Sequence, residues 1–454
     1  MDKKYFALFG ITAIAFVAFL EYMIVNNALP SLQNVFHISI LKLQWLTNVY
    51  SIVMAVATML SGRLGDMLGA RKVFYFGVLL LIIGSLGAGL SLSFDFLLIC
   101  RIIQSIGVAT CIVLARSLIQ KIFLDKTHYA MSFYASVTGL GLVLGPYIGG
   151  VIITYWDWRW AFFINIPFLI LAFLLCAPFI DEFKAEVKGK IDWYGNILLI
   201  LCLVGLIYGL VRIPQIGKID FISIISLLVF IVALPILLWV ENKIEFPILN
   251  LHFFTRRYFL LGAFSGFMAG LMVSCGMFFS PLFLQNGLLL SPAHSGLILL
   301  WFAIGVVVFA PIVGKMVKKI GLDKTVTIGI GYGFIAAIFY LLFVISGSIV
   351  FIIFACIFTG MNLANNNVAA FLAGVKGVGE QNAGLSAGTL VSIFNATAGI
   401  MVTLSTLIFH GFFKDDVKLS YLNASKNSFI AVFIFIIIVS GLVLFAATKI
   451  YKKE

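Results

Sequence analysis

Charged side chains are scarce in this sequence. Asp, Glu, Lys and Arg together make up 11% of its 454 residues, and 62% of the residues are hydrophobic. A typical soluble domain carries about 25% charged residues, because its surface must be polar. This chain cannot cover itself in that way, so most of it must be surrounded by lipid. The composition therefore argues against a soluble enzyme.

Metal-binding, redox and nucleotide-binding motifs are also missing. The six cysteines have no CxxC spacing and no neighbouring His, so we expect buried apolar side chains, no disulfide framework and no metal. The five His residues fall at predicted loops or helix ends, where they are poor proton relays. No GxxxxGK[ST] loop is present, so we expect no ATP-driven cycle and no cofactor. Clustered nucleophiles or bases are lacking too, which argues against a membrane enzyme.

Long hydrophobic runs are abundant instead. A helix needs about 20 apolar residues to cross about 30 Å of hydrocarbon. The runs lack the alternation of a transmembrane barrel, so we expect helices. The first run follows a short basic start and is too long for the core of a signal peptide. The sequence predicts fourteen transmembrane helices, at 6–29, 44–62, 73–93, 96–119, 130–153, 160–180, 193–212, 219–240, 258–283, 294–316, 325–345, 347–372, 384–409 and 427–448.

The basic residues predict the orientation of these helices. With a cytoplasmic start and an even number of helices, 21 Lys and Arg residues fall in inside segments and 7 in outside segments. This split follows the positive-inside rule, so we expect a multi-pass protein of the plasma (inner) membrane with both termini in the cytoplasm. Contact with anionic lipid also accounts for the net charge of +12, without a nucleic-acid partner.

A short repeat divides the chain into halves. Gly62-Arg-Leu-Gly-Asp-Met-Leu-Gly69 follows the second predicted helix, and Gly314-Lys-Met-Val-Lys-Lys-Ile-Gly321 follows the tenth. Carriers often consist of two related halves around a site near the membrane midplane. We therefore expect an N-terminal six-helix bundle at 1–180, two inserted helices with flanking cytoplasmic loops at 181–257, and a C-terminal six-helix bundle at 258–454.

Five motifs resemble those of the major facilitator superfamily, in particular its fourteen-helix drug:proton antiporters. They are Leu20-Glu-Tyr-Met-Ile-Val-Asn26-Asn-Ala-Leu-Pro30, Gly62-x-Leu-Gly-Asp66-x-x-Gly69-x-Arg71-Lys72, Arg101-x-x-Gln104-Ser-x-Gly107, Gly139-x-Gly141-x-x-x-Gly145-Pro146-x-x-Gly149-Gly150 and Trp158-Arg-Trp-Ala-Phe-Phe-Ile-Asn165-Ile-Pro167. The chain departs from the family pattern at Glu21, where the family usually has Asp, and at Asn27, where it usually has an apolar residue.

The resemblance implies an all-α integral membrane protein with the major facilitator fold. It implies a carrier that exports amphipathic small molecules or drugs in exchange for protons by alternating access. A dedicated exporter of one metabolite, such as a siderophore or a lipid-like product, is the alternative. The partners we expect are a small-molecule substrate, protons and the lipid bilayer, and we expect a monomer.

One acidic residue stands out among the 18 in the chain. Glu21 alone falls deep inside a predicted span, and Arg101 and Arg116 are the basic residues that do so. Intramembrane charge is costly and usually marks a functional or paired site. Rises of 1.5 Å per residue place Glu21 and Arg101 at similar depths, about 22 Å from the inner side. Glu21 as a proton carrier, with Arg101 beside it, and a static buried ion pair both remain open.

The resemblance also assigns gating residues. Gly141, Gly145 and Gly149 recur every four residues, so they share one helix face, and Pro146 removes one helical hydrogen bond. In the family this kinked seam seals one gate of antiporters, although ordinary tight packing would use the same glycines. Asp66 is expected to meet the N-terminus of the eleventh helix near Thr325 and to act as a latch. The remaining gating residues are Arg71 and Lys72.

Uncharged polar and aromatic residues in the spans are the candidates for a substrate cavity. A buried amide needs a hydrogen-bond partner, and interhelical bonding is the alternative use of these side chains. The candidates are Asn26, Asn27, Tyr50, Gln104, Asn362, Asn365, Asn366 and Asn395.

Overall fold

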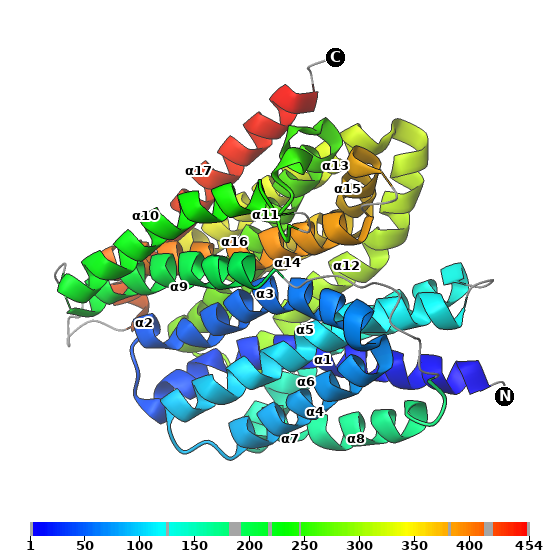
Figure 1. Ribbon diagram of the computed structural model, residues 1–454. Helices are drawn as coiled ribbons and strands as arrows, with labels where there is room; N and C mark the ends of the chain where they lie inside the picture. The colour runs from blue at the N-terminus through cyan, green and yellow to red at the C-terminus, as the bar shows by residue number, and fades with distance from the viewer. Residues whose placement is uncertain are drawn as a thin grey trace. The chain divides into compact units, whose positions relative to one another are not determined.

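The computed structural model describes residues 3–123, 127–180, 192–216, 220–244, 247–379, 383–412 and 421–451, and all regular elements in these ranges are helices (Figure 1). The N-terminal elements are α1 (Lys3–Phe36), α2 (Ile40–Leu43), α3 (Trp45–Leu68), α4 (Ala70–Gly89), α5 (Phe94–Ile122), α6 (Thr127–Tyr155), α7 (Trp160–Phe163) and α8 (Asn165–Cys176). They are followed by α9 (Trp193–Ile216), α10 (Phe221–Glu241), η1 (Leu251–Thr255), α11 (Arg257–Leu282), η2 (Phe283–Gly287) and α12 (Pro292–Ile320). The last are α13 (Leu322–Ser346), α14 (Ile349–Asn365), η3 (Asn366–Ala370), α15 (Phe371–Val378), α16 (Ala383–Phe412) and α17 (Tyr421–Tyr451).

Each of the fourteen predicted spans is helical over most of its length. Thirteen helices in the described ranges are long and apolar enough to cross a membrane. The sixth span, predicted as one helix at 160–180, is instead two short helices, α7 and α8, which meet at Ile164. The division between α13 and α14 is as predicted, and it falls at Gly347, whose φ of +71° ends α13. An all-helical architecture satisfies every backbone group inside lipid, which explains why apolar composition alone predicts it.

The first compact unit contains residues 1–37, 56–191 and 291–297. Within it, α1 packs against α5, α6 and α8, and α4 packs along α5. The first turns of α12 also belong to this unit. Because α1 has neighbours on several sides, most side chains in its middle are buried, and Glu21 is one of them.

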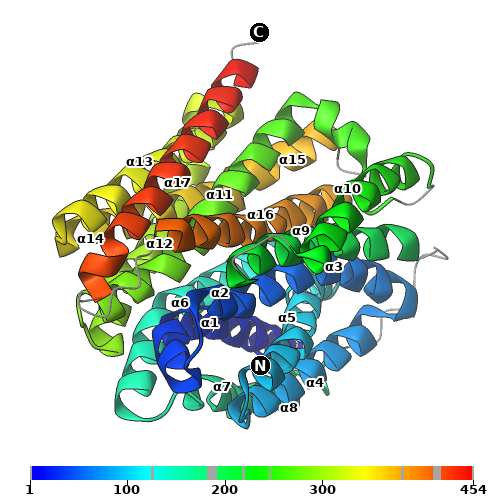
Figure 2. The same cartoon turned by 90° about the vertical axis from the view of Figure 1, so that its left-hand side faces the viewer.

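The second compact unit contains residues 38–55, 192–290 and 298–454. Its most enclosed helix is α11, which contacts α13, α14, α16 and α17. The neighbouring α13 packs against both α14 and α17, as the turned view shows (Figure 2). The inserted helices α9 and α10 pair with each other through Cys202, Ala233 and Leu237.

The predicted repeat has a structural counterpart. Gly69 precedes α4 with φ of +100°, and Gly321 precedes α13 with φ of +88°. Both positions lie in the region of positive φ that L side chains rarely adopt, so each of these sharp corners requires glycine. The amide of each glycine donates to the carbonyl four residues earlier, and its carbonyl accepts from the amide four residues later. The two halves of the chain therefore turn in the same way after their second helices.

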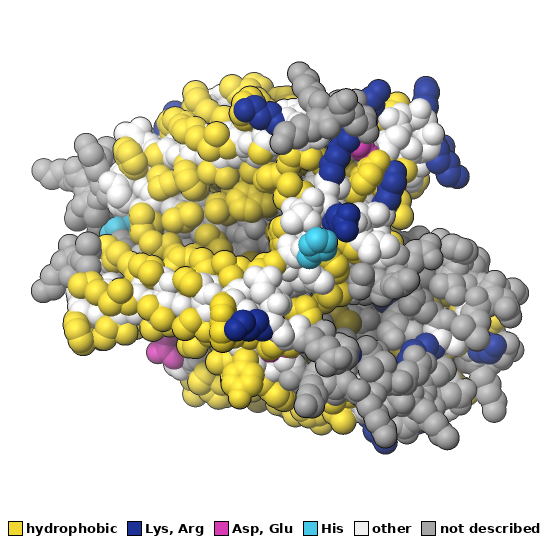
Figure 3. Space-filling view, turned by 45° about the horizontal axis from the view of Figure 1, so that its top comes forward, with side chains coloured by type: hydrophobic (Ala, Val, Ile, Leu, Met, Phe, Trp, Pro, Cys, Tyr) yellow, Lys and Arg dark blue, Asp and Glu magenta, His cyan; other side chains and the backbone are white. Residues whose placement is uncertain are grey.

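The described surface is mainly apolar. Hydrophobic side chains cover the left and central part of the face in Figure 3, and most of the visible Lys and Arg side chains lie toward its right side. Such a surface would be an aggregation hazard in water and is the expected one in lipid.

Candidate functional site

The candidate site is built around a buried ion pair in the first unit. Glu21 on α1 is 0% exposed and Arg101 on α5 is 2% exposed, and Nη1 of Arg101 donates to Oε1 of Glu21. Removing either partner would leave a charge buried without its counter-charge, at a cost of several kcal/mol. The two residues that the sequence singled out for their intramembrane charge are therefore in direct contact.

The ion pair continues into a polar chain across α5 and α4. Nη1 of Arg101 also donates to Oε1 of Gln104 at 2.6 Å, and Nε2 of Gln104 donates to Oγ of Ser85 on α4 at 2.8 Å. Gly84 allows α4 to approach α5 closely enough for this bond, because a Cβ at Gly84 would lie 2.6 Å from the backbone nitrogen of Gln104. The sequence prediction included Gln104 but missed Ser85. The feature of the sequence that could have indicated Ser85 is its polar hydroxyl within the apolar run of α4.

The two oxygens of Glu21 differ in their environments. Oε1 is bonded to Arg101, whereas Oε2 is buried and has no hydrogen-bond partner among the described residues. A buried polar atom without a partner is rare and calls for an explanation. Oε2 is thus an open acceptor, to which a proton could add without displacing the guanidinium from Oε1.

The three predicted seam glycines of α6 pack on the part of α1 that carries Glu21. A Cβ at Gly141 would lie 2.6 Å from the carbonyl oxygen of Phe16, and one at Gly149 would lie 2.9 Å from Cα of Ile24. A Cβ at Gly145 would collide with Met23. Any movement of α6 against α1 must therefore pass over the segment on both sides of Glu21.

The predicted gating loop is described in part. Nη2 of Arg71 donates to the carbonyl oxygen of Ala177 at 3.3 Å, and the hydroxyl of Tyr75 donates to the same oxygen at 2.9 Å. Ala177 caps the C-terminus of α8, where a cation is favoured by the helix dipole. Lys72 is exposed, and the side chain of Asp66 lies outside the described residues. The Asp66 contact with the next half stays a prediction.

In the second unit, two of the predicted asparagines bind a neighbouring helix. Nδ2 of Asn362 donates to the carbonyl of Gly329 at 2.8 Å, and Nδ2 of Asn365 donates to the carbonyl of Thr325 at 2.8 Å. Both side chains are 0% exposed, so these amides tie α14 to α13. Asn366 begins η3, a π-helical stretch of a kind that often occurs at functional sites. Their role in a substrate cavity stays a prediction.

The other cavity candidates have different surroundings. Nδ2 of Asn26 donates to the carbonyl of Tyr22 at 2.8 Å, and Nδ2 of Asn395 donates to that of Val391 at 2.9 Å, both within their own helices. Tyr50 is buried in the second unit. Nδ2 of Asn27 donates to backbone carbonyls of two other helices, at Pro146 and Pro292.

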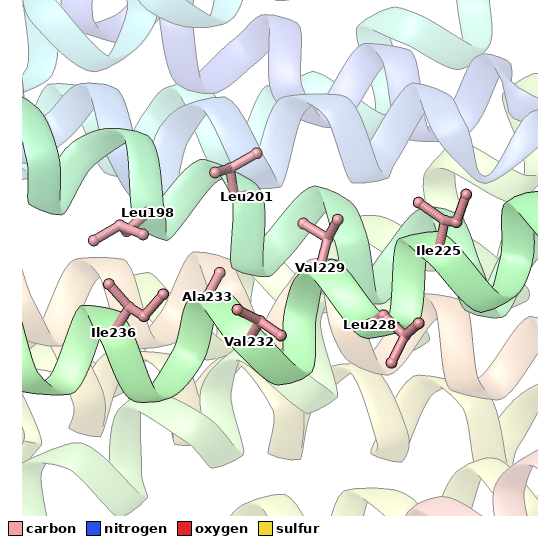
Figure 4. Close-up of a pocket in the computed structure, with 8 residues that line it drawn as sticks. All are labelled: Leu198, Leu201, Ile225, Leu228, Val229, Val232, Ala233 and Ile236. Carbon is pink, nitrogen blue, oxygen red and sulfur yellow. The ribbon is translucent and has the colours of Figure 1, made fainter.

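An apolar groove of about 380 Å³ lies between α9 and α10 (Figure 4). All eight side chains that line it are hydrocarbon: Leu198, Leu201, Ile225, Leu228, Val229, Val232, Ala233 and Ile236. It offers no polar group to orient a ligand, and we interpret it as part of the lipid-facing surface of the inserted helices.

These features define a polytopic helical membrane protein with an ion pair enclosed in its first unit. The model of the Major Facilitator Superfamily matches residues 11–406, and the chain belongs to this superfamily. Together with the candidate spans, this makes it a multi-pass protein of the plasma membrane.

Two relatives illustrate the similarity. The multidrug resistance protein Stp of Mycobacterium tuberculosis is 29% identical over 317 residues, which are 69% of this chain and 59% of Stp. The lincomycin resistance protein LmrB of Listeria monocytogenes is 30% identical over 329 residues, which are 72% of this chain and 69% of LmrB. The matched region therefore spans less than two thirds of Stp.

Solved structures share the fold. A POT family transporter in complex with 5-aminolevulinic acid superposes with a TM-score of 0.73 over 98% of this chain and 96% of that chain, at 16% identity. Structural similarity at 16% identity is evidence for the fold only. Together with the family match, it confirms the predicted major facilitator fold.

Proposed function

We propose that this chain is a proton-coupled exporter of amphipathic small molecules that works by alternating access. The observation that carries the proposal is the open oxygen Oε2 of Glu21 beside the oxygen that Arg101 holds. Intramembrane acids are rare and mark proton relays in transporters. Two relatives are named as a multidrug resistance protein and a lincomycin resistance protein, and these names support drug-like molecules as the exported substrates.

In the proposed cycle, Glu21 carries the proton. A proton on Oε2 neutralises the carboxylate and weakens its attraction for Arg101, which retains its bond to Gln104. Substrate arriving from the cytoplasm favours release of the proton, and opening to the outside reloads it. Proton entry supplies about 1.4 kcal/mol per pH unit and about 2.3 kcal/mol per 100 mV of membrane potential. Both termini face the cytoplasm in this cycle, and one chain is the working unit.

The seam of α6 and the loop after α3 are the proposed gates. Gly141, Gly145 and Gly149 hold α6 against α1 around Glu21, so a change of charge at Glu21 acts directly on this contact. On the cytoplasmic side, Arg71 holds the end of α8. Asp66 and Lys72 complete that gate in the proposal.

Transport by Glu21→Gln in proteoliposomes with an imposed pH gradient tests this function. A thermal-shift panel of lipophilic cations, neutral antibiotics including lincomycin, and siderophores first selects a probe that binds the purified protein. We expect E21Q to exchange the probe across the membrane but not to accumulate it against its gradient. The matched control, Glu21→Asp, keeps a titratable group and should retain gradient-driven accumulation. Normal accumulation by E21Q would overturn the proposed coupling.

The same panel addresses the breadth of the substrate range. Stabilisation by several unrelated amphipathic probes is the result that multidrug export predicts. Stabilisation by a single compound would replace that part of the proposal with dedicated export of one metabolite.

A further inference from the structure

Asn27 joins three helices through one amide group. Its side chain is 1% exposed, and Nδ2 donates to the carbonyl of Pro146 on α6 at 3.0 Å and to the carbonyl of Pro292 on α12 at 3.1 Å. The NH₂ group of an Asn has two hydrogens, so both are directed at backbone oxygens of other helices. The neighbouring Asn26 donates to its own helix and makes no comparable link.

The backbones around this amide approach each other very closely. A Cβ on Gly296 of α12 would collide with the carbonyl oxygen of Pro146, and a Cβ on Gly150 of α6 would collide with that of Pro292. A third bond joins the same helices, from the amide of Ala293 to Oγ1 of Thr154 at 3.0 Å. Small residues thus bring α6 and α12 together, and Asn27 bonds to both.

This contact brings together parts of the two halves of the chain. Asn27 and Pro146 belong to the predicted N-terminal bundle, whereas Pro292, the first residue of α12, belongs to the predicted C-terminal bundle. Residues 291–297 nevertheless belong to the first compact unit, while the rest of α12 belongs to the second. Rocking of one half against the other must separate α12 from α1 and α6 here. In the predicted orientation these are the outer ends of the three helices.

We propose that Asn27 is a positioning residue of the outer gate, whose amide holds α6 and α12 together while the gate is closed and releases both carbonyls when it opens. The inference rests on the proposed alternating access. It also assigns a role to Asn27 as the position of the Leu20–Pro30 motif at which the family usually has an apolar residue. An apolar side chain of similar size would keep the packing and lose both bonds.

Labelling of a buried reporter tests this role. Ser295 is 0% exposed and lies within the contact, so a thiol introduced by S295C reacts with a membrane-impermeant maleimide only while the gate is open. The six native cysteines are buried, and the parent chain measures their background reaction. Two lost hydrogen bonds between membrane helices should shift the equilibrium about tenfold. Asn27→Leu in the S295C background should therefore be labelled about tenfold faster from outside intact cells.

Matched variants separate this role from general loosening. Asn242→Ala removes an amide that donates to the carbonyl of Leu238 on α10 and should leave the labelling rate unchanged. Gly296→Ala forces the same contact apart sterically and should speed labelling, whereas Gly331→Ala, with open space around its Cβ, should not. Faster labelling of G296A with an unchanged rate in N27L would overturn the role of Asn27. Equal acceleration in N242A would do so as well.

The labelling experiment is independent of proton coupling. It uses no substrate and no imposed gradient, so failure of the Glu21 test would leave its result intact. Conversely, a coupled carrier whose N27L variant is labelled at the parent rate would keep the proposed function and lose this inference. Thermal unfolding of each purified variant, with a single transition, shows that it is folded.

Discussion

Replacing both members of the ion pair by apolar side chains should restore stability without restoring transport. In Arg101→Met, the carboxylate of Glu21 stays fully buried and loses its counter-charge. Breaking a buried pair in this way costs about 3–5 kcal/mol, whereas exchange of both partners for apolar residues is often neutral or stabilising. We therefore expect R101M to lose about 3 kcal/mol or more, and E21L/R101M to recover most of that loss.

The assay is a double-mutant cycle of the wild type, E21L, R101M and E21L/R101M. Equilibrium unfolding in mixed micelles gives the four stabilities, and proton-driven uptake into proteoliposomes gives the four activities. The double variant should unfold within about 1 kcal/mol of the wild type and transport nothing. A double variant as unstable as R101M would refute the structural reasoning. Wild-type transport by it would show that the pair serves stability alone.

Four further substitutions test the packing, each by thermal unfolding in detergent with Gly331→Ala as control. Gly69→Ala and Gly321→Ala should each lose about 1–3 kcal/mol, because both residues have positive φ; unchanged stability in either would contradict the shared turn. Gly195→Ala should lose about 1–3 kcal/mol, since its Cβ would meet two buried carboxylates; a stabilised variant would contradict that contact. Asn365→Leu should lose about 1–3 kcal/mol by leaving a buried carbonyl with one partner fewer; a neutral result would mean that the amide does not hold α13. In the control, a Cβ added at Gly331 would have open space around it, so Gly331→Ala should be neutral or slightly stabilised.

The positions of the helices could be predicted because lipid leaves the backbone few alternatives. Even the closely spaced pair α13 and α14 was separable, since Gly347 interrupts the apolar run at a turn with positive φ. The break between α7 and α8 was not predicted from hydrophobicity, although Asn165 and Pro167 directly after Ile164 are the local signal for it, since proline removes a helical hydrogen bond. Hydrophobicity determines where a segment lies in the membrane but not whether its helix is continuous.

The members of the site were predictable to different degrees for a physical reason. Glu21 and Arg101 could be identified because charge is so costly in lipid that few residues compete for the role. Ser85 could not, because a hydroxyl in a helix can bond to its own backbone and need not mark a site.

The two adjacent asparagines show what only the three-dimensional structure reveals. Asn26 and Asn27 are identical in type and neighbours in the chain, yet the first bonds within α1 and the second reaches α6 and α12. Neighbours on a helix point about 100° apart. Which direction meets another helix depends on packing that is not encoded in either residue alone.

Proton release on substrate binding measures the central claim directly. Purified protein in weakly buffered detergent is mixed with the probe selected by thermal shift, and a pH indicator reports protons set free. We predict release by the wild type at a pH where Glu21 is protonated before binding, reduced or pH-shifted release by E21D, and none by E21Q with the probe still bound. Equal release by E21Q and the wild type would contradict the assignment of the exchanged proton to Glu21.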